Sequence, residues 1–278
     1  MKLLNYFILA RWHNIFIANL AVYVTFILIG TQSWYNLLIC VLEVTFAMAF
    51  ANIMNDILDI DVDKINHPKR MLVEGLINRK KAKLLCYIFL ILTIFTSLFL
   101  ETSSRLFVYF YVLPSLISYN LFFKEKPIIG NIIVSSLLGS VFIFTELALT
   151  NDIKIMTVPF LMAFNLSFIR EFIKDIHDSF GDKKNNMNTL PIILGVKKSI
   201  LFITIYIALS VPLFLIPYII KLYNINYLIS LFFLIEIPLI YSLFLLLNNP
   251  GINTFRRLAH LHKFLAALGL IVIYLTKY

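Results

Sequence analysis

Long apolar runs alternate with short polar segments along the whole chain. Nine of these runs have about the length, roughly 20 residues, that an α-helix needs to cross about 30 Å of hydrocarbon. They lie at 6–30, 35–54, 84–100, 104–123, 128–150, 154–173, 199–220, 226–248 and 258–276. The pattern therefore predicts an all-α polytopic membrane protein, with nine transmembrane helices in a single domain over residues 1–278.

Composition agrees with this pattern. The 278 residues are 60% hydrophobic and 14% charged, with a mean hydropathy of +0.89, which excludes an ordinary soluble domain of this length. The first run contains Arg11 and His13 and has no small-residue cleavage pattern, so we expect a retained helix and not a signal peptide. Cys40 and Cys86 lie in apolar runs, without the spacing of a metal site or a disulfide.

Basic residues are distributed unequally between the two sides that nine crossings define. Twenty of the 24 Lys and Arg residues lie at the N-terminus or near the loops that follow the second, fourth, sixth and eighth predicted helices. The other side receives Arg105, Lys154, Lys221 and Lys277. By the positive-inside rule, the N-terminus and these loops lie in the cytoplasm, and the C-terminus lies outside the cell membrane. The net charge of +9 therefore requires no nucleic acid, although so basic a face also attracts anionic lipids or a phosphorylated substrate.

Two acidic segments lie in the longest polar interruptions, 55–83 and 174–198, both on the predicted cytoplasmic side. The pattern D-x-x-D-x-x-x-D begins at Asp56 and again at Asp175, 119 residues later. In a helix, positions i, i+3 and i+7 share one face, so each segment presents three carboxylates as a stripe if it continues the preceding transmembrane helix. Asp61, the fourth acid of the first segment, lies off this face.

Such stripes are unfavourable without a cation. Like charges on one helix face repel each other, and acids near a helix C-terminus oppose the macrodipole. Hard oxygen ligands a turn apart suit Mg²⁺, which keeps several waters and shares its ligands with substrate phosphates. No grouping of His and Cys favours zinc. The metal ligands predicted from the spacing are Asp56, Asp59, Asp63, Asp175, Asp178 and Asp182.

The chemistry that suits this arrangement is displacement of diphosphate from an allylic lipid. Mg²⁺ would bridge the carboxylates and the diphosphate, and the C–O bond would ionise to an allylic cation that an acceptor captures. Arg170 and Lys174 share a helix face with Asp178 and Asp182, so we expect them to contact phosphate. The two stripes would then face each other across a lipid-accessible cavity at the membrane surface, while the apolar tail stays in the bilayer.

These residues resemble the UbiA-type intramembrane prenyltransferases. That family has nine helices, an N-D-x-x-D-x-x-x-D motif after the second helix and a D-x-x-x-D motif after the sixth. Residues 55–63 and 178–182 match the two motifs at the expected helices. Residues 11–14 resemble the family's R-P-x-N, with Trp12 in place of Pro, and residues 66–70 resemble its N-x-P-x-R segment.

The resemblance implies roles by position. It adds Asn55 to the metal ligands and assigns catalysis to Asp59, Asp63, Asp178 and Asp182. It matches Lys174 to a phosphate-binding lysine, and Arg170 stands where the family often has Tyr. The residues expected to bind substrate are Arg11, Asn14, Lys69, Arg70, Lys124, Arg170, Lys174 and Lys183.

Within the family, residues 170–191 are most similar to the digeranylgeranylglyceryl phosphate synthases, with Asn188 in place of a Lys. That similarity implies Mg²⁺-dependent transfer of geranylgeranyl from its diphosphate to geranylgeranylglyceryl phosphate in ether-lipid synthesis. Lys183, Lys184 and Arg70 would then hold the phosphate of the acceptor. No protein partner is implied.

Two alternatives stay open. The first is prenylation of an aromatic acceptor, as in quinone, haem O or chlorophyll-type pathways. The second is an ion-coupled transporter, because Glu43, Glu146 and Glu236 lie inside apolar runs. Each of these three stands alone, whereas a transport route favours acids near the midplane and broken helices in matched halves. Glu146 and Glu236 could instead be buried carboxyls that line the pocket, but we interpret them as neutral or locally hydrogen-bonded groups.

Overall fold

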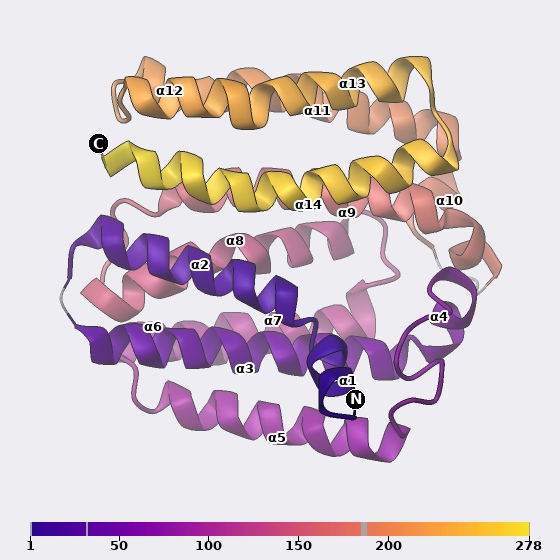
Figure 1. The fold of residues 1–278 in the computed structure, drawn as a ribbon, viewed down its shortest axis with the longest axis horizontal. Helices are drawn as coiled ribbons and strands as arrows, with labels where there is room; N and C mark the ends of the chain where they lie inside the picture. The colour runs from indigo at the N-terminus through magenta and orange to yellow at the C-terminus, as the bar shows by residue number, and fades with distance from the viewer. Residues whose placement is uncertain (1, 32, 185–187, 278) are drawn as a thin grey trace. The chain divides into compact units, whose positions relative to one another are not determined.

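The computed structural model describes residues 2–31, 33–184 and 188–277, and every regular element in these ranges is helical (Figure 1). Contacts divide the chain into two compact units. Unit 1 is Met1–Lys124 with Val141–Met156, and unit 2 is Glu125–Ser140 with Thr157–Tyr278. The prediction of a single domain stays a prediction.

Unit 1 is organised around its longest helix, α3, which packs against α2 and α5 (Figure 1). Two π-helical segments, η1 and η2, interrupt the helix that follows α5. The elements are α1 (Lys2–Leu9), α2 (Trp12–Ile29), α3 (Trp34–Leu58), α4 (Ile60–Asn66), α5 (Arg79–Ser97), α6 (Thr102–Phe107), η1 (Val108–Val112), α7 (Leu113–Ser118), η2 (Tyr119–Phe123) and the second part of α8 (Ile129–Thr150).

Unit 2 is organised around α9, which packs against α14 and α11 (Figure 1). A third π-helical segment, η3, joins α12 to α13 and packs against α14. The elements are the first part of α8, then α9 (Thr157–Lys184), α10 (Leu190–Leu194), α11 (Val196–Ile219), α12 (Ile225–Leu231), η3 (Phe232–Glu236), α13 (Ile237–Asn248), α14 (Ile252–Tyr274) and η4 (Leu275–Lys277).

Each of the nine predicted runs coincides with helix in the described ranges. Seven helical segments there are long and apolar enough to cross a membrane: Trp12–Ile29, Trp34–Leu58, Thr102–Phe123, Ile129–Thr150, Val196–Ile219, Ile225–Asn248 and Ile252–Lys277. Charged residues keep α5 and α9 out of this set, because basic residues open α5 and both signs of charge follow one another in α9. The all-helical polytopic fold is confirmed, and the number nine stays a prediction.

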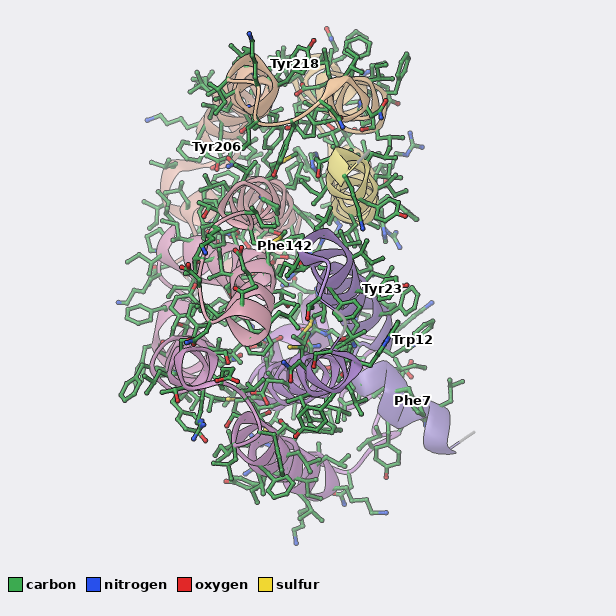
Figure 2. All side chains as sticks on the ribbon, turned by 90° about the vertical axis from the view of Figure 1, so that its left-hand side faces the viewer. Phe7, Trp12, Tyr23, Phe142, Tyr206 and Tyr218 are labelled. Atoms are coloured by element: carbon green, nitrogen blue, oxygen red, sulfur yellow. The ribbon has the colours of Figure 1, made fainter. Side chains whose placement is uncertain are left out.

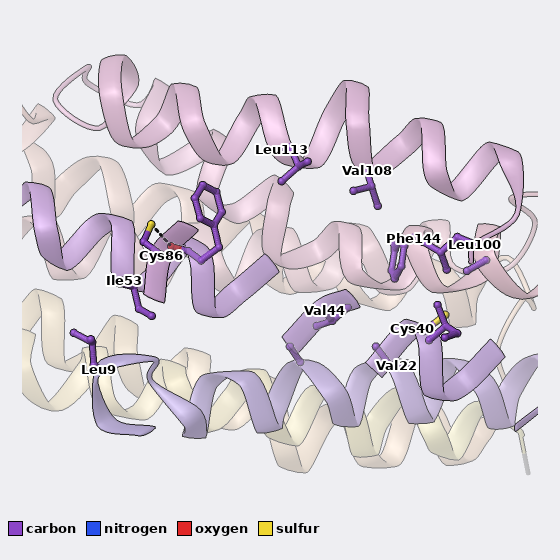
Figure 3. Packing of buried hydrophobic residues seen from close by; sticks show 14 of the residues in the cluster. Leu9, Val22, Cys40, Val44, Ile53, Cys86, Leu100, Val108, Leu113 and Phe144 are labelled. Carbon is purple, nitrogen blue, oxygen red and sulfur yellow. Dashed lines mark hydrogen bonds between the residues drawn. The ribbon is translucent and has the colours of Figure 1, made fainter. Parts of the chain in front are cut away.

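Apolar side chains from neighbouring helices form the core of unit 1 (Figure 3). Val22 of α2 packs into the same cluster as Val44 and Ile53 of α3. Cys86 of α5 joins them, with its Sγ 3.9 Å from the carbonyl oxygen of Phe50. Between helices in lipid, such van der Waals packing replaces the hydrophobic drive of a soluble core. The role of this buried thiol is therefore packing.

Large aromatic side chains lie on the outside of the first two helices (Figure 2). Phe7 of α1 and Trp12 and Tyr23 of α2 are all exposed. In a polytopic protein, an exposed aromatic ring can contact acyl chains or the interfacial layer without cost. These residues therefore agree with a lipid-facing surface on α1 and α2.

The first predicted run, 6–30, is divided in two. α1 ends at Leu9, and α2 begins at Trp12. Between them Arg11 adopts the left-handed region, with φ 57° and ψ 52°, which a residue with a Cβ rarely enters. The side chain of Asn52 on α3 donates a 2.9 Å hydrogen bond to the Ala10 carbonyl, which the interrupted helix no longer satisfies. The expectation of one continuous helix here is wrong, and the break leaves Arg11 beside α3.

The intramembrane acids of unit 1 are locally hydrogen-bonded, in agreement with the interpretation given above. Thr96 of α5 donates to Glu43 of α3 and so connects these two helices. Three backbone N–H groups of residues 154–156 donate to the Glu146 carboxylate at 2.9–3.1 Å. Glu146 therefore closes the loop that follows α8. The described contacts of Glu43 and Glu146 are thus structural hydrogen bonds within unit 1.

Unit 2 contains one very close approach between helix backbones. A Cβ added to Gly139 of α8 would lie 2.8 Å from the carbonyl oxygen of Phe160 and 3.3 Å from the backbone nitrogen of Phe164, both on α9. At Gly269 of α14, the nearest atom would be the Leu166 Cδ1 at 3.6 Å, an ordinary contact. Glycine at position 139 thus permits the packing of α8 on α9, as small residues do in membrane proteins.

We expect Gly139→Ala to destabilise the protein by about 1–3 kcal/mol, because the clash is with backbone atoms and cannot be relieved by a side-chain rotation. The midpoint of thermal unfolding in detergent should fall accordingly. Gly269→Ala is the matched control, and it should leave the midpoint unchanged or raise it, because alanine favours helix by about 1 kcal/mol over glycine. Equal midpoints for the two variants would contradict this account of the α8–α9 contact.

Candidate active site

The first acidic segment lies where α3 gives way to α4. α3 ends at Leu58, and Asp59, with φ −91° and ψ 7°, separates it from α4. The condition stated for a stripe here, that the segment continues the transmembrane helix, is therefore not fully met, because Asp59 interrupts it. The N–H groups of Asp59 and Asp63 nevertheless donate to the carbonyls four residues before them, at 2.9 and 2.8 Å. Nearly helical spacing is thus kept across the junction.

Burial separates the four acids of this segment. The side chains of Asp56, Asp59 and Asp63 are 6%, 11% and 4% exposed, whereas that of Asp61 is 86% exposed. Asp61 pairs with Lys64 at 2.7 Å, and this hydrogen bond lowers the pKa of the Asp61 carboxyl. The three buried acids are those that the i, i+3, i+7 spacing groups together.

Two guanidinium groups hold the buried acids at the ends of this segment. Arg11 Nη2 donates to Asp56 Oδ1 at 2.6 Å. Arg70 Nη1 donates to the same Asp56 oxygen at 3.0 Å and to Asp63 Oδ2 at 2.5 Å. Burial raises the pKa of Asp63, and the charge of Arg70 opposes that shift. Two guanidinium groups that are 59 positions apart in the sequence thus pair with the buried carboxylates of this segment.

The middle acid is held from the π-helical segment η2. Lys124 follows η2 directly, and its Nζ pairs with Asp59. One turn earlier, Asn120 Oδ1 accepts a 3.3 Å hydrogen bond from Asn55 Nδ2. A π-helical turn changes the direction of the residues that follow it and is frequent at functional sites. This segment thus brings an amide and an ammonium group to the end of α3.

The second acidic segment is a continuous part of α9, as predicted. Near its start, Arg170 pairs with Glu171, and Lys174 Nζ lies 3.6 Å from the other oxygen of that carboxylate. The two predicted phosphate contacts are therefore both directed at one acid in this structure. Their role with phosphate stays a prediction.

Further along α9 each acid has different surroundings. Asp175 Oδ2 accepts a 2.8 Å hydrogen bond from Asn131 Nδ2 of α8. Asp178 Oδ1 lies 2.7 Å from His177 Nδ1. Asp178 and Asp182 are both buried. Unit 2 thus holds its own group of acids toward the C-terminal end of α9.

The structure also describes three other predicted site residues. Lys69 and Lys183 are exposed, and Asn14 is half-buried in the first turn of α2. α9 ends at Lys184, and the side chain of that residue lies outside the described part of the structure. The functions assigned to these residues remain predictions.

In the described ranges, no three His, Cys, Asp or Glu side chains converge on one metal position. The buried acids of unit 1 point instead to Arg and Lys groups. Two residues of the polar network were missed from sequence, Asn120 and Asn131. Amides inside apolar runs are costly in lipid, and that cost was the available signal for both.

The comparison with known proteins decides the family. Residues 18–268 match the UbiA prenyltransferase family, which is most of the chain. The chain belongs to the UbiA prenyltransferase family. This membership confirms the predicted enzyme class, prenyl transfer, and the predicted multi-pass membrane location.

Relatives within the UbiA family include the digeranylgeranylglyceryl phosphate synthase of Methanocaldococcus jannaschii, 38% identical over 237 residues, 83% of this chain and 79% of that one. The same enzyme of Methanosphaera stadtmanae is 29% identical over 250 residues, 90% and 89% of the two chains. A solved structure of digeranylgeranylglyceryl phosphate synthase in membranes has 32% identity and a TM-score of 0.77, covering 99% of this chain and 98% of its own.

A more distant structure is that of a UbiA homolog from Archaeoglobus fulgidus bound to GPP and Mg²⁺. It has 21% identity and a TM-score of 0.69, and it covers 97% of this chain and 99% of its own. At this identity the likeness concerns the fold. All these matches extend over both units of the UbiA protein described here.

We expect Arg70→Ala to destabilise the metal-free protein by about 3 kcal/mol, at the lower end of the range for removing one partner of a buried ion pair. The physical reason is that both buried carboxylates would lose the guanidinium group of Arg70. Asp56 would keep its contact with Arg11. The measurement is thermal unfolding in detergent with EDTA. Lys64→Ala, which removes the exposed partner of Asp61, is the control and should change the midpoint little. A similar loss in both variants would argue against a special role for the buried pairs.

Proposed function

We propose that this protein transfers a geranylgeranyl group from geranylgeranyl diphosphate to the free hydroxyl of geranylgeranylglyceryl phosphate. The product is an ether lipid, and diphosphate leaves. The observation that carries the proposal is the set of buried acids paired with cations at the end of α3, in a membrane protein of the UbiA family. The choice of acceptor rests on the named relatives that are up to 38% identical to this chain.

The residues of both acidic segments suit Mg²⁺. Their ligand atoms are hard carboxylate and amide oxygens, which this ion prefers. Mg²⁺ commonly keeps several waters and takes further oxygens from a substrate phosphate. When bound, Mg²⁺ supplies charge that stabilises the departing diphosphate. The residues proposed to hold it are Asn55, Asp56, Asp59, Asp63, Asp175, Asp178 and Asp182.

The basic residues at these acids have two tasks in the proposal. Without substrate, Arg11, Arg70 and Lys124 neutralise the buried carboxylates. With substrate, they bind the phosphate oxygens, because a guanidinium or ammonium group stabilises the negative charge that develops on a leaving diphosphate. In the proposal, Arg170 and Lys174 also bind phosphate oxygens. To do so, their side chains turn away from the Glu171 carboxylate, which they contact in this structure.

The acceptor phosphate needs cations of its own. We assign the binding of the acceptor phosphate to Arg70 and Lys183. Each has a second lysine next to it in the sequence, Lys69 before Arg70 and Lys184 after Lys183. Arg170 stands where the family often has Tyr, and a cation there favours an anionic lipid headgroup over a neutral aromatic ring. We place the N-terminus and these loops in the cytoplasm and the C-terminus outside, because twenty basic residues lie on the former side.

The acceptor is tested with purified protein in lipid, Mg²⁺ and geranylgeranyl diphosphate. We expect a prenylated product with geranylgeranylglyceryl phosphate and none with aromatic acids. Product formation should stop with EDTA and return with added Mg²⁺. Product with aromatic acceptors alone would overturn the choice of a glycerol hydroxyl and favour a quinone-type or haem-type pathway.

The two acidic segments are tested by removing one charge from each. Asp59→Asn and Asp178→Asn keep the side-chain shape, and each should lower kcat/KM by about 100-fold or more, the size typical of losing one group that stabilises transition-state charge. Asp61→Asn is the matched control from the same segment and should stay near the wild-type rate, because Asp61 is exposed. Full activity of both Asp59→Asn and Asp178→Asn would refute the metal-bridged mechanism.

A further inference from the structure

The interior of unit 2 contains a histidine that the proposed function does not use. His262 of α14 is 0% exposed, and neither ring nitrogen has a hydrogen-bond partner in the described ranges. A buried polar group without a partner costs free energy, so its presence in a membrane-spanning helix requires an explanation. Ionisable residues inside a bilayer commonly mark a functional site.

Two further groups with unpaired atoms come from the elements that pack on α14. From α9, the Arg170 guanidinium acts electrostatically on the His262 ring, and its own Nε is buried without a partner among the described residues. From η3, Glu236 is 2% exposed, and neither of its carboxylate oxygens has a hydrogen-bond partner there. α14 packs against both α9 and η3 (Figure 1).

The position of Arg170 along α9 relates this interior group to the reaction. Arg170 precedes Lys174 by four residues and Asp178 by eight, which corresponds to roughly 6 and 12 Å along a helix. The proposed diphosphate contacts lie at Lys174 and Asp178. The allylic carbon that carries the diphosphate lies deeper in the bilayer than the diphosphate itself, because the apolar tail extends from that carbon into the lipid. The reacting carbon is therefore expected about one turn deeper, at the level of Arg170 and His262.

We propose that His262 accepts the proton of the acceptor hydroxyl. This inference rests on the proposed function, in which the acceptor is an alcohol. The C–O bond between the allylic carbon and diphosphate breaks, and its electron pair leaves with diphosphate. The hydroxyl oxygen forms the new C–O ether bond, and its proton moves to a ring nitrogen of His262. Atoms and charges balance, and no oxidant or reductant is needed.

The surroundings of the ring suit this role. Neither ring nitrogen is engaged in a hydrogen bond among the described residues, so a nitrogen lone pair is available when the acceptor arrives. During the reaction a negatively charged diphosphate departs at the neighbouring turn, and its charge offsets the new charge on the ring. His262 is favoured over Glu236 because its own helix, α14, packs directly on α9, which carries the proposed diphosphate contacts, whereas Glu236 lies on η3, which packs on α14.

The test uses the full-length protein in lipid and separates the loss of diphosphate from the capture of the cation. Geranylgeranyl diphosphate carries ¹⁸O at its bridging oxygen, and the acceptor analogue has hydrogen in place of the hydroxyl. Scrambling of the label then reports ionisation without ether formation. For His262→Gln we expect ether formation with the true acceptor to fall by about 100-fold or more, as for loss of a general base, while scrambling stays within about twofold of wild type.

Glu236→Gln is the matched control. It changes the carboxylate of unit 2 whose two oxygens lack a hydrogen-bond partner among the described residues, and it should keep ether formation near the wild-type rate. If His262→Gln does not accumulate as folded protein, His262→Asn serves in its place under the same criteria.

Three outcomes would overturn the assignment: ether formation unchanged in the His262 variant, scrambling lost together with ether formation, or ether formation lost in Glu236→Gln alone. Failure of the proposed function is a separate result. In that case the wild-type protein itself makes no ether from geranylgeranylglyceryl phosphate, whatever the variants do.

Discussion

The stability of a carboxylate out of water depends on the cation beside it, and this constraint governs the C-terminal end of α3. Asp56, Asp59 and Asp63 are buried where ionised groups are costly, and each is paired with Arg or Lys. The partners come from a break between two helices, from the loop before α5 and from the residue after a π-helical segment. Several irregular features of unit 1 are therefore explained by one electrostatic requirement.

The same requirement links structure to turnover. Acids that are already paired with cations need no metal to stay folded, and in the proposed function those cations would become available for phosphate once the acids bound Mg²⁺. In the proposed function, the net charge of the site would change little between the empty and the substrate-bound state. The reason is that diphosphate and metal carry charges of opposite sign. The exposed pair of Asp61 and Lys64 shows the contrast, since water already solvates both members.

Hydropathy and spacing predicted the helices and both acidic segments, because those features depend on local periodicity. They did not predict the break at Arg11 or the junction at Asp59, since each depends on a partner far along the chain. Asn52 satisfies the carbonyl beside the first break, and the two residues are 42 positions apart. The amides at Asn120 and Asn131 were missed for the same reason, because apolar periodicity does not reveal which polar group a buried amide meets.

The position of Arg11 also bears on where the functional protein begins. The match to the family starts at residue 18, whereas Arg11 lies before it and contacts Asp56 within the first acidic segment. A version of the chain reduced to its family-matched part would keep every acid and lose one of the two guanidinium groups on Asp56. The ion-pair network around the first acidic segment thus extends beyond the part of the chain that matches the family.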